Sequence, residues 1–589
     1  MNDIWNLDVI YPGFDSPDFD HDFKSLEVLA KEFADFSGQL ETQDALDGLR
    51  RGISYMERIG ELGSKLTHYA ILRQSANTRD SQAGSQLGRI MGVLSGTAAP
   101  EAAFRAWAAK RADLMELAEQ DEVLKQDRFL LKTIAQSGRY LLSNQGEEIM
   151  AKMTLSGGNA WEQLQQHLTS TVPVRYQGTT TNLPAIRNLA YDPDPQVRKE
   201  AYEAELGCYD RIKDAVAFAL NSLKLETITD CELRGYDSAL DRTLKQAYMS
   251  RQTLDAMLGA MDEYLPKFRQ YLKAKAKALG HENGLPWYDL FAPMGSCSTR
   301  FTTEQARDYL VEHFASFDQE LADMVARAFD EEWIDFYPRD GKTGGAFCSN
   351  LLPGLGYSRI LTNFDGTFSD VVTLAHELGH AFHNHCIRDH RFLNQDYSMP
   401  LAETASTFNE CLIKEAAIAG CADRSEKLAL IESQLQDTTQ IIVDIYSRYR
   451  FEDAVIAKRP EQFMDADTLC AMMIQAQKES YGDGLDANRM HPYMWVCKSH
   501  YYGPTYYNFP YAFGGLFARG LYAQYEKEGT AFVPKYKKLL HTTTVATAED
   551  VAKVADIDLT DKEFWRGALQ TVAEQIDLFC EIVEEEYGK

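Results

Sequence analysis

Residues 371–383 of the 589-residue chain form an amphipathic stretch, VVTLAHELGHAFH. Thr367 and two further polar residues precede it, and such residues are typical of a helix cap and first turn. In a helix His376 and His380 lie one turn apart on one face, where both rings can direct a nitrogen at one ion. Glu377 lies at the adjacent edge of that face. We therefore predict a helix that presents these side chains together.

The spacing His-Glu-x-x-His is typical of a zinc site in which the glutamate acts as general base. A catalytic zinc also needs a third protein ligand and an open position for water. Glu403 is the candidate, because Pro400 suits the first turn of a second helix and leaves Glu403 inside that turn. The sequence predicts one Zn²⁺ held by His376, His380 and Glu403, with Glu377 as the catalytic carboxylate.

Glu410 follows Glu403 by two helical turns on the same face. Two interpretations stay open for it: a carboxylate that orients a ligand histidine, or a solvated or helix-pairing glutamate. A fourth protein ligand would close the position that catalysis needs. The remaining candidates are therefore expected not to bind the metal: His383 is assigned to packing or an outer position, His385 and His390 to the surface, and Cys386 and Cys411 to buried thiols.

Residues 340–366 interrupt the helical pattern that prevails elsewhere. Two short β-prone runs flank the turn-forming residues 353–356, which predicts a hairpin or small sheet immediately before the histidine-rich helix. Apolar residues three and four apart predict helices over 22–39 and 102–117. Helix breaks are expected at 144–146, 156–158, 192–195 and 280–286.

The composition excludes several classes of protein. The length excludes a small binding module, and the 45% hydrophobic content excludes an intrinsically disordered chain. The formal net charge of −28 repels phosphate, and no basic stripe interrupts it. We therefore expect binding neither to nucleic acid nor to an anionic membrane.

The chain start shows no secretory pattern, and no apolar stretch approaches the roughly 18 residues of a transmembrane helix. The ten cysteines are scattered without a C-x-x-C pair, which is typical of reduced thiols. The sequence thus predicts a cytoplasmic protein.

Four ordered blocks carry a resemblance to a known family: Gly344–Cys348, Asn363–Thr367, His376–His383 and Glu403–Glu410. Together they resemble the oligoendopeptidase F branch of the M3, thimet-type metallopeptidases. The segments 11–17 and 155–161 resemble that branch too, so the likeness covers nearly the whole chain.

The resemblance implies a mainly α fold of the gluzincin type. It is expected to be a large two-lobed helical body with a deep substrate channel, zinc at the channel floor and a small β-sheet beside the zinc helix. The implied lobes are an N-terminal helical lobe over 1–195 and a catalytic domain over 196–589.

The segment 500–514 is similar to the family's His- and Tyr-rich segment, whose donors stabilise the tetrahedral intermediate. Phenol and imidazole donors near a metal suit a developing oxyanion. We assign this role to His500, Tyr507 and Tyr511. The neighbouring Tyr501, Tyr502 and Tyr506 are assigned to packing.

The predicted function is a zinc-dependent oligoendopeptidase that hydrolyses internal bonds of short unstructured peptides, with metal-activated water and a glutamate base. A peptide is expected to lie extended along the strand 358–364 at an exposed sheet edge. The predicted substrate-binding residues are Gly344, Gly345, Ala346 and Ile360. Oligopeptides are the only predicted partners, and the oligomeric state stays open.

Three alternatives remain from the sequence. A zinc carboxypeptidase or dipeptidase would use the same metal chemistry but would need a positive group for a free terminus. A helical peptide-binding protein without activity would carry the motif by accident. Another zinc hydrolase would share the motif, because a motif does not fix the substrate.

Overall fold

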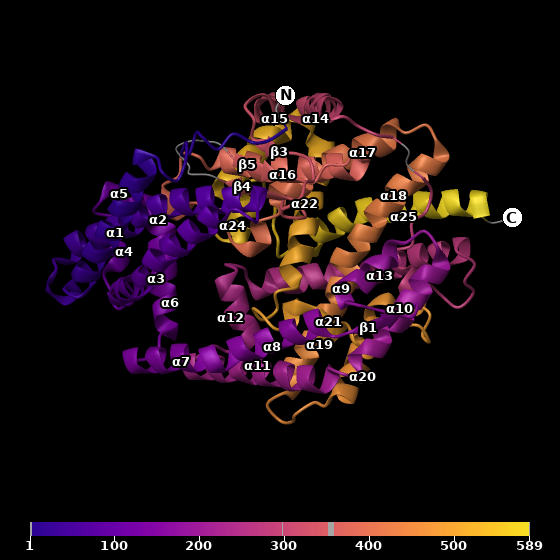
Figure 1. Cartoon of the computed structure of the whole chain (residues 1–589), viewed down its shortest axis with the longest axis horizontal. Coiled ribbons are helices and arrows are strands. Elements are labelled where there is room, and N and C mark those ends of the chain that lie inside the picture. Colours follow the sequence, from indigo (N-terminus) through magenta and orange to yellow (C-terminus); the bar gives the residue numbers. More distant parts are fainter. Residues whose placement is uncertain (1–2, 297–298, 351–357, 588–589) are drawn as a thin grey trace.

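Helices α1–α6 build the N-terminal part of the chain and lie together at one end of the molecule (Figure 1). The computed structural model describes residues 3–296, 299–350 and 358–587. The six helices are α1 (Pro17–Ser37), α2 (Ala45–Ala76), α3 (Ser81–Ala109), α4 (Leu114–Ala118), α5 (Glu122–Gln126) and α6 (Arg128–Ser137). Their apolar faces form a separate core, in which α1, α2 and α3 pack against one another.

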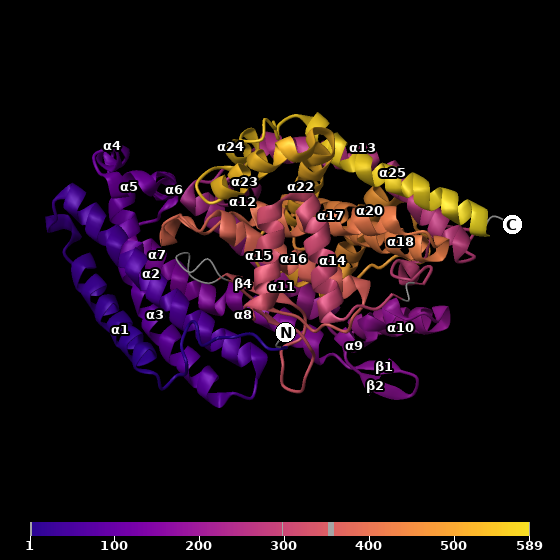
Figure 2. The same ribbon diagram turned by 90° about the horizontal axis from the view of Figure 1, so that it is seen from above.

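Buried residues between Val172 and Val583 form a second and larger core, although Leu361 packs into the N-terminal one. Its first elements are α7 (Asn144–Ser156), α8 (Gly158–Thr171), β1 (Val174–Tyr176), β2 (Thr179–Thr181), α9 (Leu183–Asn188), α10 (Pro195–Tyr209), α11 (Lys213–Arg234), α12 (Ala239–Gln246), α13 (Arg251–Ala278), α14 (Thr303–Phe317) and α15 (Gln319–Asp330). The later helices are α16 (Phe368–Cys386), α17 (Thr404–Gly420), α18 (Arg424–Thr439), α19 (Ile445–Lys458), α20 (Ala466–Tyr481), α21 (Met494–Cys497), α22 (Phe509–Glu528), α23 (Val533–Thr542), α24 (Ala548–Lys553) and α25 (Lys562–Tyr587). The long helices α13 and α25 pack along each other on one side of this part (Figure 2).

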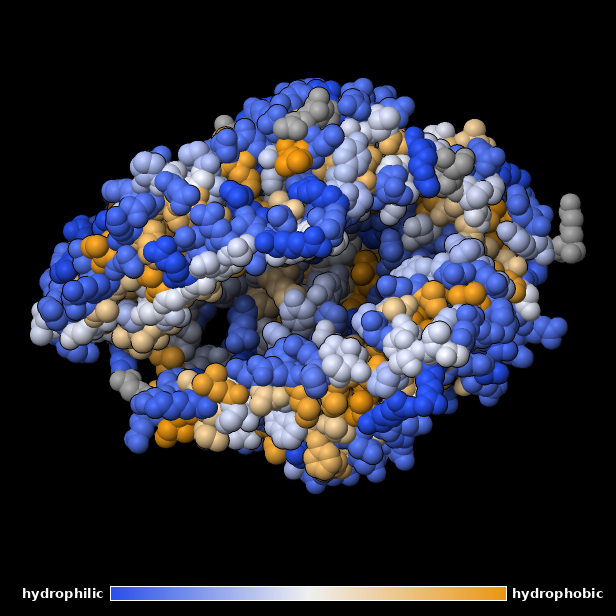
Figure 3. Space-filling model, viewed as in Figure 1, coloured by the Kyte–Doolittle hydropathy of each residue, from blue (hydrophilic) through white to orange (hydrophobic). Residues whose placement is uncertain are grey.

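The expected mainly helical body with two lobes is confirmed. Val172, Leu183 and Ile186 pack into the larger core, so the two cores separate N-terminal to the boundary placed after residue 195. The division into 1–195 and 196–589 stays a prediction. Figure 3 shows the surface deeply hollowed between the upper and lower parts of the molecule.

Most expected helix limits are confirmed. The apolar residues of 22–39 are buried in α1, which begins earlier because Ser16 caps it and Pro17 starts its first turn. The breaks at 156–158, 192–195 and 280–286 coincide with helix ends. The segment 144–146 instead begins α7, capped by Ser143.

The expected single helix over 102–117 is wrong, since the chain turns between α3 and α4. Trp107 at the end of α3 and Leu114 at the start of α4 are both buried in the N-terminal core. A turn between them brings both side chains to the same core.

The expected hairpin is confirmed as part of a three-stranded sheet: β3 (Ile334–Asp335), β4 (Phe347–Asn350) and β5 (Ser358–Leu361), in the order β3-β5-β4. β5 pairs antiparallel with β4, Cys348 opposite Ile360, and parallel with β3, Ile334 opposite Ile360. The predicted turn at 353–356 lies outside the described residues, as do Met1, Asn2 and Cys297.

The expected exposed edge on the strand 358–364 is wrong. β5 is the central strand, and its four residues are buried. Within the part of the chain that the structure describes, the free edge on this side belongs to β4, whose residues are half-buried. The sequence could not show this, because β3 is a two-residue strand and carries no periodic signal of its own.

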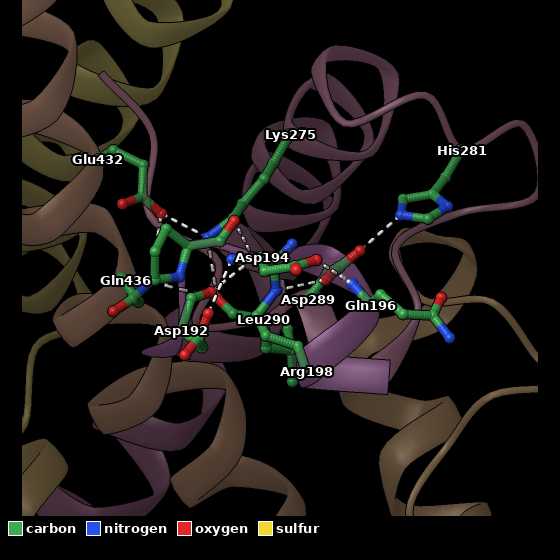
Figure 4. A network of polar contacts seen from close by, with 11 residues as sticks. Asp192, Asp194, Gln196, Arg198, Lys275, His281, Asp289, Leu290, Glu432 and Gln436 are labelled. Atoms are coloured by element: carbon green, nitrogen blue, oxygen red, sulfur yellow. Dashed lines mark hydrogen bonds and ion pairs between the residues drawn. The ribbon is translucent and has the colours of Figure 1, made fainter. Parts of the chain in front are cut away.

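A buried polar network holds α10, α13 and α18 together in the larger lobe (Figure 4). Asp289 accepts a hydrogen bond from Arg198 Nε at 2.8 Å and contacts His281 Nε2 at 2.6 Å. Lys275 pairs with Glu432 at 2.5 Å, and both side chains are buried. These pairs tie α10 to the turn at Asp289 and α13 to α18, and removing one partner would leave a buried charge uncompensated at a cost of about 3–5 kcal/mol.

Among the helices that the structure describes, none has an apolar stretch long enough to cross a lipid bilayer. The cysteines of the described residues are all free thiols.

Candidate metal centre

The predicted histidine helix is α16, and its start is confirmed. Thr367 caps it by accepting a hydrogen bond from the backbone N–H of Asp370, whose side chain in turn accepts from the Thr367 backbone N–H. This reciprocal capping satisfies two backbone donors at the helix start. The chain thereby enters α16 in a defined register, with His376 and His380 one turn apart.

The structure brings His376, His380 and Glu403 together. Their ligand atoms all lie within 4.8 Å of one another. Oε2 of Glu403 is 3.4 Å from Nε2 of His376 and 3.4 Å from Nε2 of His380. Donor atoms at ~2.0–2.1 Å from a tetrahedral zinc lie about 3.3 Å apart, so the three atoms fit one such ion.

Glu403 lies just outside the helix where it was expected. Pro400 belongs to a 3₁₀ turn, Met399–Leu401, and α17 begins one residue after Glu403. The Ser406 hydroxyl donates a hydrogen bond to Glu403 Oε2 at 2.7 Å. This contact orients the carboxylate toward the two histidines.

Gly379, inside the His-Glu-x-x-His stretch, lets α16 approach α17. A Cβ atom at this position would lie 2.5 Å from Ser406 Cα and 2.6 Å from the Ala405 carbonyl oxygen. Both contacts are with backbone, which cannot move aside as a flexible side chain would. Glycine here allows the two helices that carry the three candidate ligands to pack closely.

Replacing Gly379 by alanine is expected to destabilise the fold by about 1–3 kcal/mol, because the added methyl overpacks this contact. It should also weaken metal binding, since the helices move apart. Chemical denaturation and metal titration measure the two effects. The matched control is Gly92→Ala in α3, where a Cβ meets nothing within 4 Å. An equally stable, equally metal-binding Gly379→Ala protein would contradict the close approach.

Glu410 contacts a candidate ligand, which favours the first of its two interpretations. Its Oε1 is 2.6 Å from Nδ1 of His376, and its Oε2 accepts a hydrogen bond from Lys414 at 2.8 Å. Burial alone would raise the pKa of Glu410, but the charge of Lys414 and the contact with His376 outweigh it and lower the pKa to about 2. The ionised carboxylate holds His376 with Nε2 toward the metal position.

Burial also shifts the protonation of Glu377 and His380. It raises the pKa of the Glu377 carboxyl to about 7, with the charges of Glu403 and Glu410 adding to it and that of His376 opposing it. It lowers the pKa of His380 to about 4, which keeps that imidazole neutral near pH 7. A neutral imidazole is the form that binds metal. A raised pKa suits a group that must accept and return a proton.

The side chains expected not to bind the metal lie elsewhere. His383 is fully buried, 2.7 Å from the Thr543 hydroxyl, and it stacks on Tyr397, as expected for a packed residue. His385 and His390 are half-buried rather than at the surface, and each ring has polar partners. Cys386 is half-buried and Cys411 is buried.

His500, Tyr507 and Tyr511 come together. Their ring centroids form a triangle with sides of 5.7 Å. Burial lowers the pKa of His500 to about 4, so its ring is neutral near pH 7. The packing assignment of Tyr501, Tyr502 and Tyr506 is confirmed, since all three are buried.

Tyr511 of this triangle lies on α22, which packs against the candidate ligand Glu403. A Cβ at Gly514 would lie 3.3 Å from Glu403 Cβ, so α22 passes directly over Glu403. Tyr511 lies one turn earlier on the same helix, and the charge of Glu403 is among the causes that raise its pKa, after burial and Tyr507.

The predicted substrate-binding residues separate into two groups. Gly344 and Gly345 are exposed and Ala346 is half-buried in the loop that leads into β4. Gly345 has φ +79°, a conformation that favours glycine. Ile360 is fully buried in β5, and β5 pairs with a strand on each side, so the assignment of Ile360 to substrate binding is wrong.

A cavity of about 690 Å³ lies along β4. One wall comes from α2, α3 and α6 of the N-terminal lobe, and the other comes from β4 and the segment after α16. Cys348 of β4 lines this cavity, and β4 packs against α16, the helix that carries the two candidate histidine ligands.

The residues that support the candidate ligands were not among those predicted. Ser406 follows Glu403 by three residues and Lys414 follows Glu410 by four, so helical spacing carried a signal for both. The close approaches at Gly379 and Gly514 depend on neighbouring helices and had no local signal.

The fold and this site define a helical metallopeptidase with a His-Glu-x-x-His centre. The family described as Peptidase family M3 matches residues 188–571, and that described as Oligopeptidase F matches residues 108–172. The first match spans more than half of the chain. The chain belongs to peptidase family M3, and the predicted membership of its oligoendopeptidase F branch is confirmed. It is a metalloendopeptidase, which excludes the helical protein without activity.

Known proteins similar to the chain agree with this. Oligopeptidase PepF of Bacillus subtilis is 24% identical over 99% of the chain and 87% of its own length. Group B oligopeptidase PepB of Streptococcus agalactiae is 26% identical over 78% of the chain and 77% of its own. The solved oligoendopeptidase-F of Enterococcus faecium has a TM-score of 0.73 at 17% identity, covering 97% of this chain and 99% of that one. A solved protein of Chlamydophila abortus reaches 0.86 at 19% identity, covering 98% of both chains, and so shares the fold.

Proposed function

We propose that the chain is a zinc-dependent oligoendopeptidase that cleaves internal bonds of short, unstructured peptides. The observation that carries the proposal is the convergence of His376, His380 and Glu403, with their donor atoms at separations that suit one zinc ion. Glu377 lies on the same helix, buried and next in sequence to a ligand.

A zinc ion bound by these residues would lower the pKa of water from about 15.7 toward about 7 and polarise a carbonyl. Glu377 accepts the proton from the attacking water and passes it to the leaving amine. Burial supports both steps, because it brings the pKa of Glu377 to about 7. Glu410 keeps His376 oriented throughout.

His500, Tyr507 and Tyr511 donate hydrogen bonds to the developing oxyanion in this proposal. Their support is the 5.7 Å triangle next to the helix that covers Glu403. The remaining phenols of the segment are buried and cannot reach a substrate.

Replacing Tyr511 by phenylalanine is expected to lower kcat by about 10²–10³-fold with little change in KM, because the lost donor acts mainly in the transition state. Tyr507→Phe and His500→Gln should act in the same direction. Initial rates on a quenched fluorescent peptide give both constants. Tyr446→Phe on α19, whose hydroxyl donates to Asp262, is the control. Unchanged kcat in all three variants would remove this assignment.

The peptide lies in the cavity along β4, and its backbone pairs with the free edge of that strand. Backbone pairing reads no side chains, so it tolerates many sequences. The exposed Gly344 and Gly345 leave the entry to this edge open.

Mass-spectrometric mapping of products from a mixed peptide pool, with and without a chelator, tests the proposal. We expect internal cleavage, loss of activity with the chelator and recovery with zinc. End-blocked peptides should be cleaved as well as free ones. Release of single residues or dipeptides from free termini alone would favour a carboxypeptidase or dipeptidase instead. The free thiols of the described residues suit the reducing cytoplasm, which we propose as the location.

A further inference from the structure

A second cluster of metal-binding groups lies outside the catalytic centre. Asp389 and His390 belong to the segment that follows α16, and His541 lies in the last turn of α23. Each residue offers one ligand atom, and these atoms all lie within 4.8 Å of one another. Oδ1 of Asp389 is 3.1 Å from Nε2 of His541, close to the ~3.3 Å between two ligands of a tetrahedral zinc.

The rings in this cluster are held in place. His390 and His541 meet edge to face, with centroids 4.1 Å apart. Nδ1 of His390 is 2.8 Å from the Thr544 hydroxyl and 3.3 Å from the Asn394 carbonyl oxygen, so Nε2 is the remaining donor. A ligand histidine is commonly oriented in this way through its other ring nitrogen.

Charge and protonation also suit a cation. Burial is the main cause that lowers the pKa of His390, and the neighbouring His541 adds to it, so the neutral ring is favoured. The pKa of Asp389 is lowered although burial opposes this, because a backbone hydrogen bond and the contact with His541 stabilise the carboxylate. The cluster also lies by the C-terminal ends of α16 and α23, where helix dipoles favour positive charge.

We propose that Asp389, His390 and His541 form a second site for a divalent transition-metal ion, with zinc as the probe. Two imidazoles and one carboxylate suit zinc and leave a position for water. The site joins two distant segments of the chain, since His541 follows Asp389 by 152 residues.

The position suggests what a bound ion does. The next residue, Arg391, pairs with Glu57 of α2 and with Asp127 at 3.2 Å. Asn394 and Thr544, which hold His390, both line the cavity along β4. An ion at this site therefore braces the junction between the two lobes beside the substrate cavity.

Zinc binding to the full-length protein over a chelator-buffered range of free zinc tests the proposal. We expect a first equivalent at low free zinc and a second, weaker one at higher free zinc. His541→Gln and Asp389→Asn should leave binding of the first zinc unchanged. They should weaken binding of the second zinc by more than the 10–100-fold that is typical when a residue that only orients a ligand is removed. Glu403→Ala should keep the second. His167→Gln, an exposed histidine of α8, is the matched control.

Both variants are expected to fold, since the side chains of His541 and Asp389 are 42% and 73% exposed. Hydrogen exchange of residues 387–397 provides a second measurement and should slow only as the second equivalent binds. Uptake of one equivalent by the unchanged protein over the whole range would overturn the proposal. So would a second equivalent of equal affinity in both variants.

Discussion

Glu377→Gln is expected to lower the rate of peptide cleavage by at least about 10²–10⁴-fold while the protein keeps its metal. Glutamine preserves the shape of the side chain but cannot accept a proton. Glu377 is 6% exposed, and burial already disfavours the charged form of its carboxyl, so a neutral amide should not destabilise the fold. Initial rates on a quenched fluorescent peptide, zinc content and thermal unfolding give the three readouts.

The matched control for this variant is Glu312→Gln, an exposed glutamate of α14, which should leave the rate unchanged. Full turnover by Glu377→Gln would show that another group accepts the proton. Loss of activity together with loss of zinc would instead place Glu377 in metal binding, and the base would have to be sought elsewhere.

Glu403→Ala is expected to have the largest effect on metal affinity at the catalytic centre. Glu403 Oε2 lies 3.4 Å from both histidine nitrogens, and alanine removes that donor entirely. The loss should exceed the 10–100-fold typical of an outer-shell partner. Zinc content at low buffered free zinc measures it, and peptidase activity should fall in parallel.

Ser406→Ala provides the comparison for this result. It keeps the carboxylate and removes only the 2.7 Å hydrogen bond to it, so zinc affinity should fall by about 10–100-fold and activity should return with added zinc. Equal zinc content in Glu403→Ala and the unchanged protein would refute the ligand role. Equal losses in both variants would mean that Ser406 is itself a ligand or that its replacement unfolds the start of α17.

Much of the candidate site was predictable because its information is local. Spacing of three or four residues on one helix places His376, Glu377 and His380 together, and the cap at Thr367 sets where that helix begins. Glu403 was found because the chemistry of the site demanded a third ligand. Pro400 lies in a 3₁₀ turn and not in the first turn of the helix, but Glu403 still directly precedes α17.

The free edge of the three-stranded sheet was not predictable in the same way. Which strand of a sheet has a free edge depends on all its partners, and β3 comes from residues 334–335, far outside the hairpin. β3 pairs with one edge of β5, and β4 pairs with the other. The exposed edge therefore lies at 347–350 and not at the expected 358–364, and Ile360 is buried.

The sequence alone determined the candidate set: helical periodicity aligns His376, Glu377 and His380 on one helix, and the need of a catalytic zinc for a third ligand points to Glu403. Tertiary structure alone decided that Glu403 lies 3.4 Å from both histidines, that Gly379 lets α16 and α17 touch, and that β4 borders the cavity. It also brought Asp389 and His541 within 3.1 Å. Such contacts depend on how distant helices pack, and no local pattern of residues encodes that distance.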